Sequence, residues 1–463
     1  MTKDQIIDLE IGDLNNLGNG VGRYEGQVVF VRGAVIGDRV RTKVIKVNKS
    51  FAVAKLLEVI EPSPMRMDGN FCGMPLSCGG CVYRNITYES ELELKRRYVK
   101  AEFIKAGLPD VNVLPVLSAG KICGYRNKGQ YPVSKGKNGT YAGFYAAKTH
   151  NIIPAEDCRI QNENFRDILR FVCAFADANN WSVYDEKSGK GLLRHVYLRI
   201  AVSTGEIMLC LVLNGERLDK ENDFVDSVRE KFPGIVSIML NVNTDNTNVV
   251  LGKNYRTIYG KDGIEDRLCG LDFFISPASF YQVNHDGAEL LYGKAAELAD
   301  LHKNEILMDL YCGTGTIGLS MAHRVKKLYG VEIVESAVDC ARENALRNGI
   351  DNAEFCCADA GDKDVIMRIS GGVRPDVVVI DPPRKGSTRE LVECLSYLGV
   401  PKIVYVSCGP DTLARDCAWF LQNGYRIGDV QPVDMFPRTG HVETVVLLSH
   451  KKPDGHIMMP LVF

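Results

Sequence analysis

The sequence predicts an α/β protein in three parts: a small N-terminal β-barrel, a central α/β domain and a C-terminal doubly wound sheet. In the last part, short apolar strands such as ILMDLY, PDVVVID and KIVYVS recur at similar intervals and are separated by helical segments. This alternation predicts a largely parallel sheet with helices on both faces. We expect the domains to span residues 1–61, 62–269 and 270–463.

The first part contains runs rich in β-branched residues, QVVFVRG, DRVRTKVIKV and FAVAKLLEVI, separated by glycine-rich turns. Such runs predict the strands of a small barrel. Gly18, Gly20 and Gly22 have the spacing of a nucleotide loop, but a hairpin-like segment follows them instead of a helix. We therefore expect these glycines to shape a turn.

The central part begins with a predicted helix over residues 86–107 and continues with strand-like runs such as HVYLRIAVS and EIMLCLVLN. Between Val111 and Ala155 there is no Asp or Glu, and cations alternate with aromatic residues: Lys121, Arg126, Lys128, Lys135, Lys137 and Lys148, with Tyr125, Tyr131, Tyr141, Phe144 and Tyr145. Cations that neutralise phosphates, beside rings on which bases stack, suit single-stranded RNA. A solvated hairpin with core aromatics explains the pattern equally well.

The composition is that of an ordinary globular protein, with 45% hydrophobic and 25% charged residues. No apolar run is long enough for a transmembrane helix, and the polar N-terminus lacks the apolar core of a signal peptide. We expect a cytoplasmic protein with no membrane contact. The 15 scattered cysteines do not suggest a disulfide framework, and most are expected to be small buried hydrophobes. The net charge of −2 gives no indication of a nucleic-acid partner.

A glycine-rich loop, Asp309-Leu-Tyr311-Cys-Gly313-Thr-Gly315-Thr-Ile-Gly318, follows an apolar strand and opens a helix. Glycines there let the backbone approach a ligand, and Glu332 ends the next strand, where a carboxylate can bind ribose hydroxyls. The loop has neither the dinucleotide G-x-G-x-x-G spacing nor a P-loop lysine. It resembles motif I of class I methyltransferases, which bind S-adenosylmethionine.

Cys408 lies in Ser407-Cys408-Gly409-Pro410, after the strand KIVYV and just before a predicted helix. A cysteine before a helix N-terminus lies in a positive potential, which predicts a lowered thiol pKa. A buried core cysteine would not need these neighbours or this position at the end of a strand. We therefore expect Cys408 to be a nucleophile.

A methyltransferase needs such a thiolate when the target is carbon 5 of a pyrimidine. Addition of the thiolate to C6 makes C5 nucleophilic, and a general base must later remove the C5 proton. Glu443 is the best candidate for this base, and His441 is the competitor by its ordinary pKa. Spacing alone does not choose between them.

A third strand of this sheet is followed by Asp381-Pro-Pro-Arg384-Lys-Gly386. Many methyltransferases that act on amino groups have an aromatic residue where Arg384 stands, so amino-group methylation is disfavoured. Asp381 can accept a hydrogen bond from uracil N3–H, whereas cytosine N3 is itself an acceptor.

Together these residues resemble the RNA uridine-5-methyltransferases that act on ribosomal and transfer RNA. The similar segments are Phe280-Tyr-Gln282-Val-Asn284, Asp309–Gly318, Glu332, Asp381–Gly386, Ser407–Pro410 and His441-Val-Glu443-Thr. The N-terminal barrel is similar to the OB-like TRAM domain of many members. The family's usual Ser-Cys-Asn-Pro is Ser-Cys-Gly-Pro here, which keeps the nucleophile.

The resemblance implies a role for each matched residue. Cys408 would be the C6 nucleophile and Glu443 the base. The cofactor site would contain Gln282, Tyr311, Gly313, Glu332 and Asp381, and the uracil site would contain Phe280, Gln282 and Asp381.

Cys72, Cys78 and Cys81 offer three thiolate ligands in one short segment, and either Cys123 or Cys158 can complete a set of four. Zinc also suits four thiolates. The resemblance selects Cys158 and implies a [4Fe–4S] cluster in the central domain. The spacing differs from that of radical enzymes, so we expect a structural or RNA-positioning role.

The sequence thus predicts a monomer that methylates uridine C5 in RNA, with 23S rRNA as the first choice of substrate. The tRNA T-loop uridine is the second choice. A cytosine-5 methyltransferase uses the same thiolate chemistry, and Asp381 argues against it. An RNA-binding assembly factor without activity would not need Cys408, Glu443 and the glycine loop.

Overall fold

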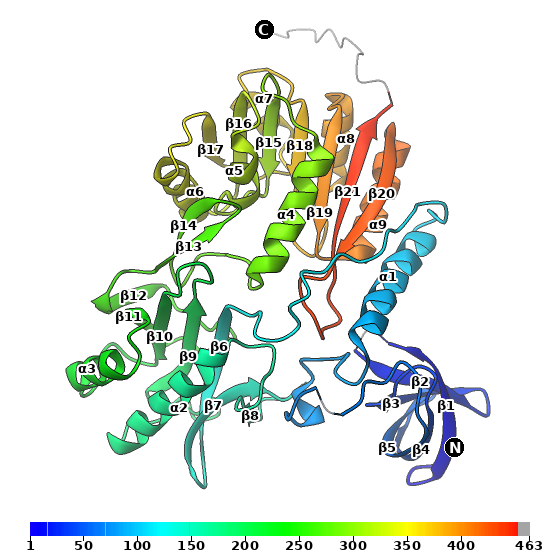
Figure 1. Cartoon of the computed structure of the whole chain (residues 1–463), viewed down its shortest axis with the longest axis vertical. Coiled ribbons are helices and arrows are strands. Elements are labelled where there is room, and N and C mark those ends of the chain that lie inside the picture. Colours follow the sequence, from blue (N-terminus) through cyan, green and yellow to red (C-terminus); the bar gives the residue numbers. More distant parts are fainter. Residues whose placement is uncertain (16, 70, 148, 452–463) are drawn as a thin grey trace.

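The computed structural model describes residues 1–15, 17–69, 71–147 and 149–451. It contains a closed barrel, two seven-stranded sheets and a two-stranded hairpin (Figure 1). The predicted α/β class with an N-terminal barrel is confirmed. All 15 cysteines are free thiols, and none of the described helices is long and apolar enough to cross a membrane.

The barrel closes in the strand order β1-β2-β3-β5-β4. Its inward positions alternate with outward ones, and Val29, Val31, Ala52 and Ala54 are at most 2% exposed. Gly18, at φ +71°, lies in the turn before β2, as expected. Gly20 and Gly22 lie within β2, so the expectation that they shape a turn is wrong for these two. The strands are β1 (Ile6–Leu14), β2 (Asn19–Tyr24), β3 (Gln27–Arg32), β4 (Arg39–Val47) and β5 (Phe51–Glu61).

The central sheet has the order β12-β11-β10-β9-β6-β7-β8, and of these pairs only β10–β11 is parallel. Helices α2 (Glu163–Ala178) and α3 (Glu221–Lys231) pack their apolar sides on it, around Phe165, Trp181 and Phe224. The strands are β6 (Lys128–Gly136), β7 (Gly139–Tyr145), β8 (Ile152–Pro154), β9 (Leu193–Ile200), β10 (Ile207–Leu213), β11 (Ile235–Val242) and β12 (Asn254–Gly260). The hairpin of β13 (Ile264–Leu268) and β14 (Leu271–Ile275) leads to the C-terminal part.

The C-terminal sheet has the order β17-β16-β15-β18-β19-β21-β20. Five neighbouring strands are parallel, and β21 is antiparallel to both of its neighbours. The order reverses between β15 and β18, where ligands bind in doubly wound sheets. The strands are β15 (Ile306–Leu310), β16 (Lys327–Glu332), β17 (Ala353–Cys357), β18 (Val377–Ile380), β19 (Lys402–Ser407), β20 (Tyr425–Val433) and β21 (Glu443–His450).

Helices cover both faces of this sheet. Side chains of α4 (His285–Ala299), α5 (Thr316–Ala322) and α6 (Glu335–Arg347) belong to the apolar core on one face. The core on the other face includes side chains of α7 (Lys363–Ile369), α8 (Arg389–Tyr397) and α9 (Pro410–Gln422). Helix α1 (Tyr88–Lys105), which precedes the central sheet in the chain, also contributes to this second core, next to α9 and β20. The boundaries at residues 61 and 269 therefore stay a prediction.

A buried ion network joins α1 to residues 434–442, here called the β20–β21 loop. Lys95 Nζ lies 2.8 Å from Glu91 Oε1 and 2.7 Å from Asp434 Oδ1, and all three side chains are at most 1% exposed. Tyr88 donates to the second Asp434 oxygen (2.7 Å). The Arg438 backbone N–H donates to Glu91 (2.6 Å), and its guanidinium lies 3.5 Å from the same carboxylate. The network fixes the loop that leads into β21.

We predict that Lys95→Met lowers the stability of the protein strongly. It would leave the Glu91 and Asp434 carboxylates buried without their shared ammonium, a loss of about 3–5 kcal/mol. At about 2 °C per kcal/mol, the melting temperature should fall by at least about 6 °C. Arg97→Gln is the control, because the Arg97–Glu93 pair is exposed and should change stability by less than about 0.5 kcal/mol. Equal melting temperatures for the two variants would contradict a stabilising network.

Candidate active site at the edge of the C-terminal sheet

The glycine-rich loop leaves β15 by a sharp backbone turn. Tyr311, Gly313 and Gly315 all have positive φ, at +65°, +54° and +81°. Such values are costly for Tyr311, and strained residues of this kind are concentrated at functional sites. The Glu332 carboxylate, at the end of β16, accepts a hydrogen bond from the Gly313 N–H (3.1 Å). The loop and the predicted ribose-binding carboxylate are therefore in contact.

The Asp309 side chain connects the start of the glycine-rich loop to helix α5. It is fully buried, and its Oδ2 accepts from the Gly318 N–H (2.8 Å) on α5. A Cβ at Gly318 would lie 2.7 Å from the same oxygen, so only glycine allows this contact. The motif thus joins β15 to α5 and leaves the turn between them open to a ligand.

Strand pairing brings Cys408 and Glu443 together. Ser407, the last residue of β19, is in register with Thr444 of β21. The Thr444 hydroxyl donates to the Ser407 carbonyl (3.1 Å). Because the strands are antiparallel, the residue after Ser407 and the residue before Thr444 lie at the same end of the sheet. Cys408 is half-buried there and Glu443 is 6% exposed.

The environment of Cys408 raises the pKa of its thiol. Burial is the main cause, the negative charges of Glu443 and Asp381 add to it, and Arg384 opposes it, which gives a pKa of about 11. The lowered pKa predicted from the start of α9 is therefore wrong for the protein by itself. Desolvation and two nearby carboxylates outweigh the potential of the helix terminus.

The two carboxylates also hold protons more tightly than usual. Burial, with the charge of Asp381, raises the pKa of Glu443 to about 8, and burial raises the pKa of Asp381 to about 7. Arg384 lowers the pKa of Glu443. Carboxylates with a pKa near 7 are suited to accept and release protons at neutral pH.

His441 has different surroundings from Glu443. The His441 side chain reaches solvent. The part of its ring that is shielded from water, together with the positive charges of Arg384, Arg126 and Lys95, lowers its pKa. These charges place it toward a basic part of the molecule. The buried Glu443, whose charge acts directly on the Cys408 thiol, fits the role of base better.

The predicted cofactor and substrate residues lie around the switch point of the sheet. Asp381 follows β18, whose last residue is in register with the ends of β15 and β19. The Tyr292 hydroxyl lies 3.2 Å from the Thr316 hydroxyl, and its pKa, raised by burial, is also shifted by Asp381 and Gln282, which places these two residues in the same neighbourhood. Phe280 remains 65% exposed, on the segment that also carries Gln282.

Several candidate residues were not predicted from the sequence. Arg384, considered only as the replacement of an aromatic residue, influences both Cys408 and Glu443. Ile333 and Val334, directly after Glu332, are 65% and 51% exposed and offer apolar surface beside the loop. Asp359 follows β17 at the same edge and acts on the pKa of Tyr311. Its position after a strand was the available signal.

The four predicted ligand cysteines line one cavity, which is bordered by the 3₁₀ helix η1 (Leu76–Cys78). Burial, with the nearby thiols of Cys158, Cys72 and Cys78, raises the pKa of Cys81 to about 12. Cys123 is exposed and does not line this cavity. The tertiary structure therefore favours Cys158 as the fourth member, and four thiols fit a thiolate-ligated metal or cluster. Within the described ranges no three side chains of ligating type are already arranged around a metal position.

The basic segment is only partly a binding surface. Tyr125 and Tyr131 are at most 2% exposed and belong to the apolar core, so these two rings cannot stack on bases. Tyr145 is 36% exposed and donates to Glu186 (2.5 Å). Lys128 is half-buried, and its pKa is lowered to about 8 by burial and by nearby arginines. Lys148 lies outside the described residues.

Comparison with known proteins shows matches along nearly the whole chain. Residues 87–451 match the family described as tRNA (Uracil-5-)-methyltransferase, and residues 2–57 match the TRAM domain. An uncharacterized RNA methyltransferase of Clostridium tetani is 42% identical over 448 residues, 97% of each chain. One of Clostridium acetobutylicum is 40% identical over 450 residues, covering 96% of this chain and 97% of its own.

One solved structure is also similar along nearly the whole chain. The crystal structure of Pyrococcus abyssi tRNA (uracil-54, C5)-methyltransferase in complex with S-adenosyl-L-homocysteine has a TM-score of 0.77 and 29% identity. The similarity covers 96% of this chain and 100% of that one.

We predict that the stability of the protein falls as the pH rises toward 8. Between the ordinary values, 4.5 for Glu443 and 3.8 for Asp381, and their raised values of about 8 and about 7, the folded state binds more protons than the unfolded state. The free energy of unfolding therefore decreases with rising pH in this window. The Glu443→Gln variant lacks one of these two titrating groups. Its melting temperature should therefore decline less than that of wild type as the pH rises through this window. Exposed Glu393→Gln should follow wild type, and an identical decline in Glu443→Gln would refute the raised pKa.

Proposed function

The chain belongs to the tRNA (uracil-5-)-methyltransferase family, and we propose that it methylates uridine through a covalent bond between Cys408 and carbon 6. It is an S-adenosylmethionine-dependent RNA (uracil-5-)-methyltransferase with an N-terminal TRAM domain. The observation that carries the proposed mechanism is that the Ser407–Thr444 pair of β19 and β21 brings Cys408 and Glu443 to the same end of the sheet, where the Glu443 charge acts on the Cys408 thiol.

The reaction begins when the Cys408 thiol releases its proton to solvent and the resulting thiolate adds to C6 of the uracil ring. Arg384 favours this thiolate, since its charge lowers the pKa of Cys408. The addition leaves C5 and O4 as an enolate, and C5 then forms the new bond to carbon. S-adenosylmethionine supplies the methyl group that C5 accepts.

Glu443 completes the reaction by removing the C5 proton. The electrons of the C–H bond re-form the C5–C6 double bond, and the Cys408 sulfur leaves C6. The proton is then held on the Glu443 carboxyl, whose pKa of about 8 suits a base that must accept it and later release it at neutral pH.

Asp381 is proposed to select uracil. Its carboxylate can accept a hydrogen bond from N3–H, which would favour its ionised form over the neutral form that burial promotes. A cytosine N3 has no proton to donate. The exposed ring of Phe280 and the amide of Gln282 would complete the uracil side of the site.

The cofactor is proposed to lie along the glycine-rich loop. Gly313 offers a close backbone approach and Glu332 can bind ribose hydroxyls. Tyr311 and Asp381 follow β15 and β18 at the switch point, and Gln282 and Asp381 both act on the Tyr292 hydroxyl. The Glu332 carboxylate already accepts the N–H groups of Gly313 and Val334, so its orientation is fixed before a ligand binds.

We propose 23S rRNA in the cytoplasm as the substrate. The four-cysteine set beside a TRAM barrel supports this choice through the resemblance to the ribosomal enzymes. The second candidate is tRNA, which is supported by the family description and by the Pyrococcus abyssi enzyme that acts on uracil 54. Mapping 5-methyluridine in rRNA and tRNA of cells without the gene distinguishes the two, because only the true substrate loses the modification.

We also propose that Cys72, Cys78, Cys81 and Cys158 bind a [4Fe–4S] cluster. This proposal is supported by two observations. The four cysteines line one cavity, and a [4Fe–4S] cluster is held by four cysteine thiolates. The cluster would hold residues 72–86, here called the cysteine segment, against the turn after β8 that carries Cys158.

The covalent mechanism predicts two different trapped states. Wild type incubated with 5-fluorouridine RNA and S-adenosylmethionine should form an RNA–protein adduct that resists denaturation, because fluorine cannot leave C5 as a proton. Glu443→Gln should form the adduct with ordinary RNA, because its C5 proton is not removed. Cys408→Ala should form neither. Gel electrophoresis of radiolabelled RNA measures all three, and an adduct in Cys408→Ala would overturn the assignment of the nucleophile.

The cluster assignment predicts that iron and sulfide depend on Cys158 and not on Cys123. Anaerobically purified wild type should be brown and contain both elements in equal amounts. Cys158→Ser should lose most of the iron and the brown colour, whereas Cys123→Ser should keep both. If the purified protein contains zinc and no sulfide, the cysteines form a zinc site and not an iron–sulfur cluster. Equal iron contents in the two variants would refute Cys158 as a ligand.

A further inference from the structure

Asp416 is a fully buried acid of helix α9 that has no part in the proposed reaction so far. Its Oδ2 accepts hydrogen bonds from the Ser387 backbone N–H (2.7 Å) and from the Tyr405 hydroxyl (2.6 Å). Ser387 belongs to the loop after β18, which also carries Arg384, and Tyr405 belongs to β19. One carboxylate therefore joins three elements at the end of the sheet where Cys408 lies.

The Tyr405–Asp416 hydrogen bond closes the segment that carries Cys408. Tyr405 precedes the cysteine on β19, and Asp416 follows it on α9. Both residues are 0% exposed, so water does not compete for this hydrogen bond, and the low local dielectric strengthens it. The strand end and the start of the helix are thus fixed relative to each other on both sides of the thiol.

The loop of residues 384–387 packs directly against this carboxylate. Gly386, at φ +78°, lies so near that a Cβ at this position would be 2.6 Å from Asp416 Oδ2. A side chain there would displace the loop or the carboxylate, and its backbone conformation would also be costly. The close approach of the loop backbone therefore depends on glycine.

Arg415 attaches the same loop from its outer side. Its Nε donates to Asp416 Oδ1 (2.8 Å), and its Nη2 donates to the Lys385 carbonyl (2.9 Å). The guanidinium also lies over the Trp419 ring, 4.5 Å from its centroid. The loop backbone is therefore held through Lys385 by Arg415 and through Ser387 by Asp416.

Arg384 depends on this loop for its position. Its side chain is exposed, and within the part of the chain that the structure describes its guanidinium forms no ion pair or hydrogen bond. Burial raises the pKa of Cys408 and of Glu443, and the charge of Arg384 opposes both effects. A Cβ at Gly409 would lie 3.6 Å from the Arg384 carbonyl, so the loop backbone also lies next to the turn after Cys408.

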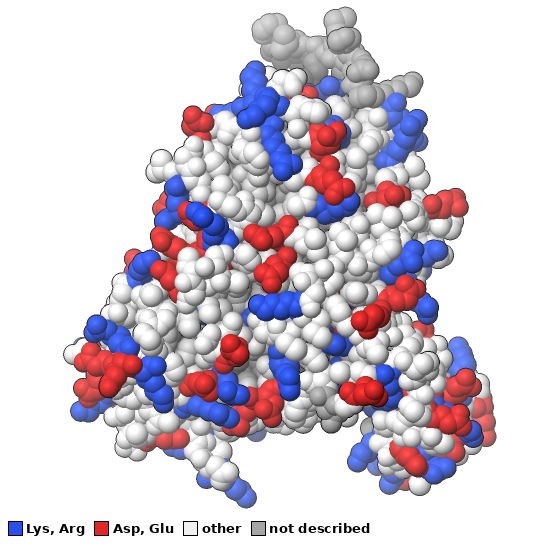
Figure 2. Space-filling model, viewed as in Figure 1, with Lys and Arg blue, Asp and Glu red and all other residues white. Residues whose placement is uncertain are grey.

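The burial of Asp416 distinguishes it from the charged residues on the surface. There, basic and acidic side chains are interspersed, as Figure 2 shows for one face, and exposed pairs of this kind fix little because water and salt screen them. Burial raises the pKa of Asp416, and the hydrogen bonds with Tyr405, Ser387 and Arg415 oppose this effect. A buried carboxylate with several donors imposes one geometry on the groups around it.

We propose that Asp416 is a positioning residue for the reaction: it holds the loop of residues 384–387 so that the Arg384 guanidinium acts on Cys408. Tyr405 and Arg415 are its partners in this role. Asp416 does not touch the reacting atoms, and it affects the thiol through Arg384. The proposal rests on the proposed function, because it takes Cys408 as the nucleophile.

The test is the rate at which iodoacetamide alkylates Cys408 at pH 8 in the protein without RNA, measured on its peptide by mass spectrometry. Only the thiolate reacts, so the rate reports the ionised fraction of Cys408. Asp416→Asn should slow alkylation about fivefold, and so should Arg384→Gln, because both remove a nearby cation from the thiolate. Loss of the Asp416 charge by itself has the opposite sign, since removing a negative charge favours a thiolate. Faster or unchanged alkylation in Asp416→Asn would overturn the proposal.

A double variant distinguishes positioning from a general loss of structure. Arg384→Gln/Asp416→Asn should react no more slowly than Arg384→Gln, because Asp416 then has no guanidinium to position. Independent effects would multiply to about 25-fold and would overturn the proposal. Tyr405→Phe keeps the ring and removes one donor to Asp416. It should slow alkylation in the same direction, and it serves if Asp416→Asn does not fold.

The same variants have an expected effect on the reaction itself. Asp416→Asn should slow the formation of the adduct with 5-fluorouridine RNA about fivefold, because fewer Cys408 thiols are ionised. Its affinity for the RNA should stay within about twofold of wild type, since Asp416 is buried and cannot contact RNA. A variant that loses RNA affinity and keeps the wild-type adduct rate at saturating RNA would contradict a role at Cys408.

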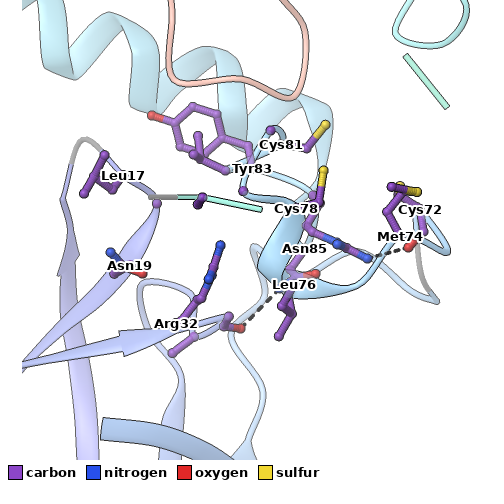
Figure 3. A pocket seen from close by; sticks show the side chains of 18 of the residues that line it. Leu17, Asn19, Arg32, Cys72, Met74, Leu76, Cys78, Cys81, Tyr83 and Asn85 are labelled. Carbon is purple, nitrogen blue, oxygen red and sulfur yellow. Dashed lines mark hydrogen bonds between the residues drawn. The ribbon is translucent and has the colours of Figure 1, made fainter. Parts of the chain in front are cut away.

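Two controls accompany these measurements. Asp226→Asn removes an exposed carboxylate of α3 and should react like wild type. The cavity that holds the cysteine segment, shown in Figure 3, is lined by neither Asp416 nor Tyr405. The content of bound metal in Asp416→Asn and Tyr405→Phe should therefore equal that of wild type. Loss of this metal together with slow alkylation in both variants would indicate general unfolding and would overturn the positioning role.

The proposed reaction and the positioning role can fail separately. If wild type forms no adduct with 5-fluorouridine RNA while Asp416→Asn slows alkylation only when Arg384 is present, the reaction fails and the positioning of Arg384 stands. If wild type forms the adduct and the effects of the two substitutions multiply, only the positioning role fails.

Discussion

The edge of the C-terminal sheet that carries Cys408 and Glu443 depends on the buried ammonium of Lys95. This group joins Glu91 of its own helix to Asp434, 339 positions along the chain, and it also donates to the Phe436 carbonyl. A buried carboxylate that loses its charged partner lowers the free energy of unfolding by several kcal/mol. Helix α1 and the β20–β21 loop are therefore held in the one arrangement that satisfies all the charges. Arg438, at φ +70°, adopts a costly backbone conformation within the same network. Glu443 then begins β21 directly beyond this fixed loop.

Burial at this edge has two chemical consequences. It raises the pKa of the Cys408 thiol, and it raises the pKa of Glu443 and Asp381 to about 8 and about 7. The raised pKa of Cys408 keeps its thiol protonated at neutral pH in the protein without bound RNA or cofactor. The second gives carboxyl groups that exchange protons near neutral pH. Arg384 opposes the first effect, so its position after Asp381-Pro-Pro matters electrostatically as well as for the choice of substrate.

The cysteine segment and the residues around it are tied to the same loop, since the Tyr83 N–H donates to the Arg438 carbonyl (3.1 Å). Arg438 lies over the Phe71 ring, 4.6 Å from its centroid, and Tyr125 donates to the Pro437 carbonyl (2.9 Å). A contact from the N-terminal half of the chain thus reaches the residues just before Glu443. This connection gives a physical reason why a metal group proposed on the four cysteines would affect Cys408 and Glu443, through the position of the β20–β21 loop.

The sequence alone determined the fold class, the glycine-rich loop, the cysteine before α9 and the family, because these depend on local patterns of strands, turns and motif spacing. It could not decide between Glu443 and His441 or between Cys158 and Cys123, since strand pairing and the closure of a cavity bring distant residues together. It also predicted the wrong direction for the pKa of Cys408. The helix terminus is visible in the sequence, whereas the burial and the two carboxylates that outweigh it arise only when β18, β19 and β21 meet. Likewise, only the packing of Tyr125 and Tyr131 into the core showed which rings of the basic segment remain free for RNA.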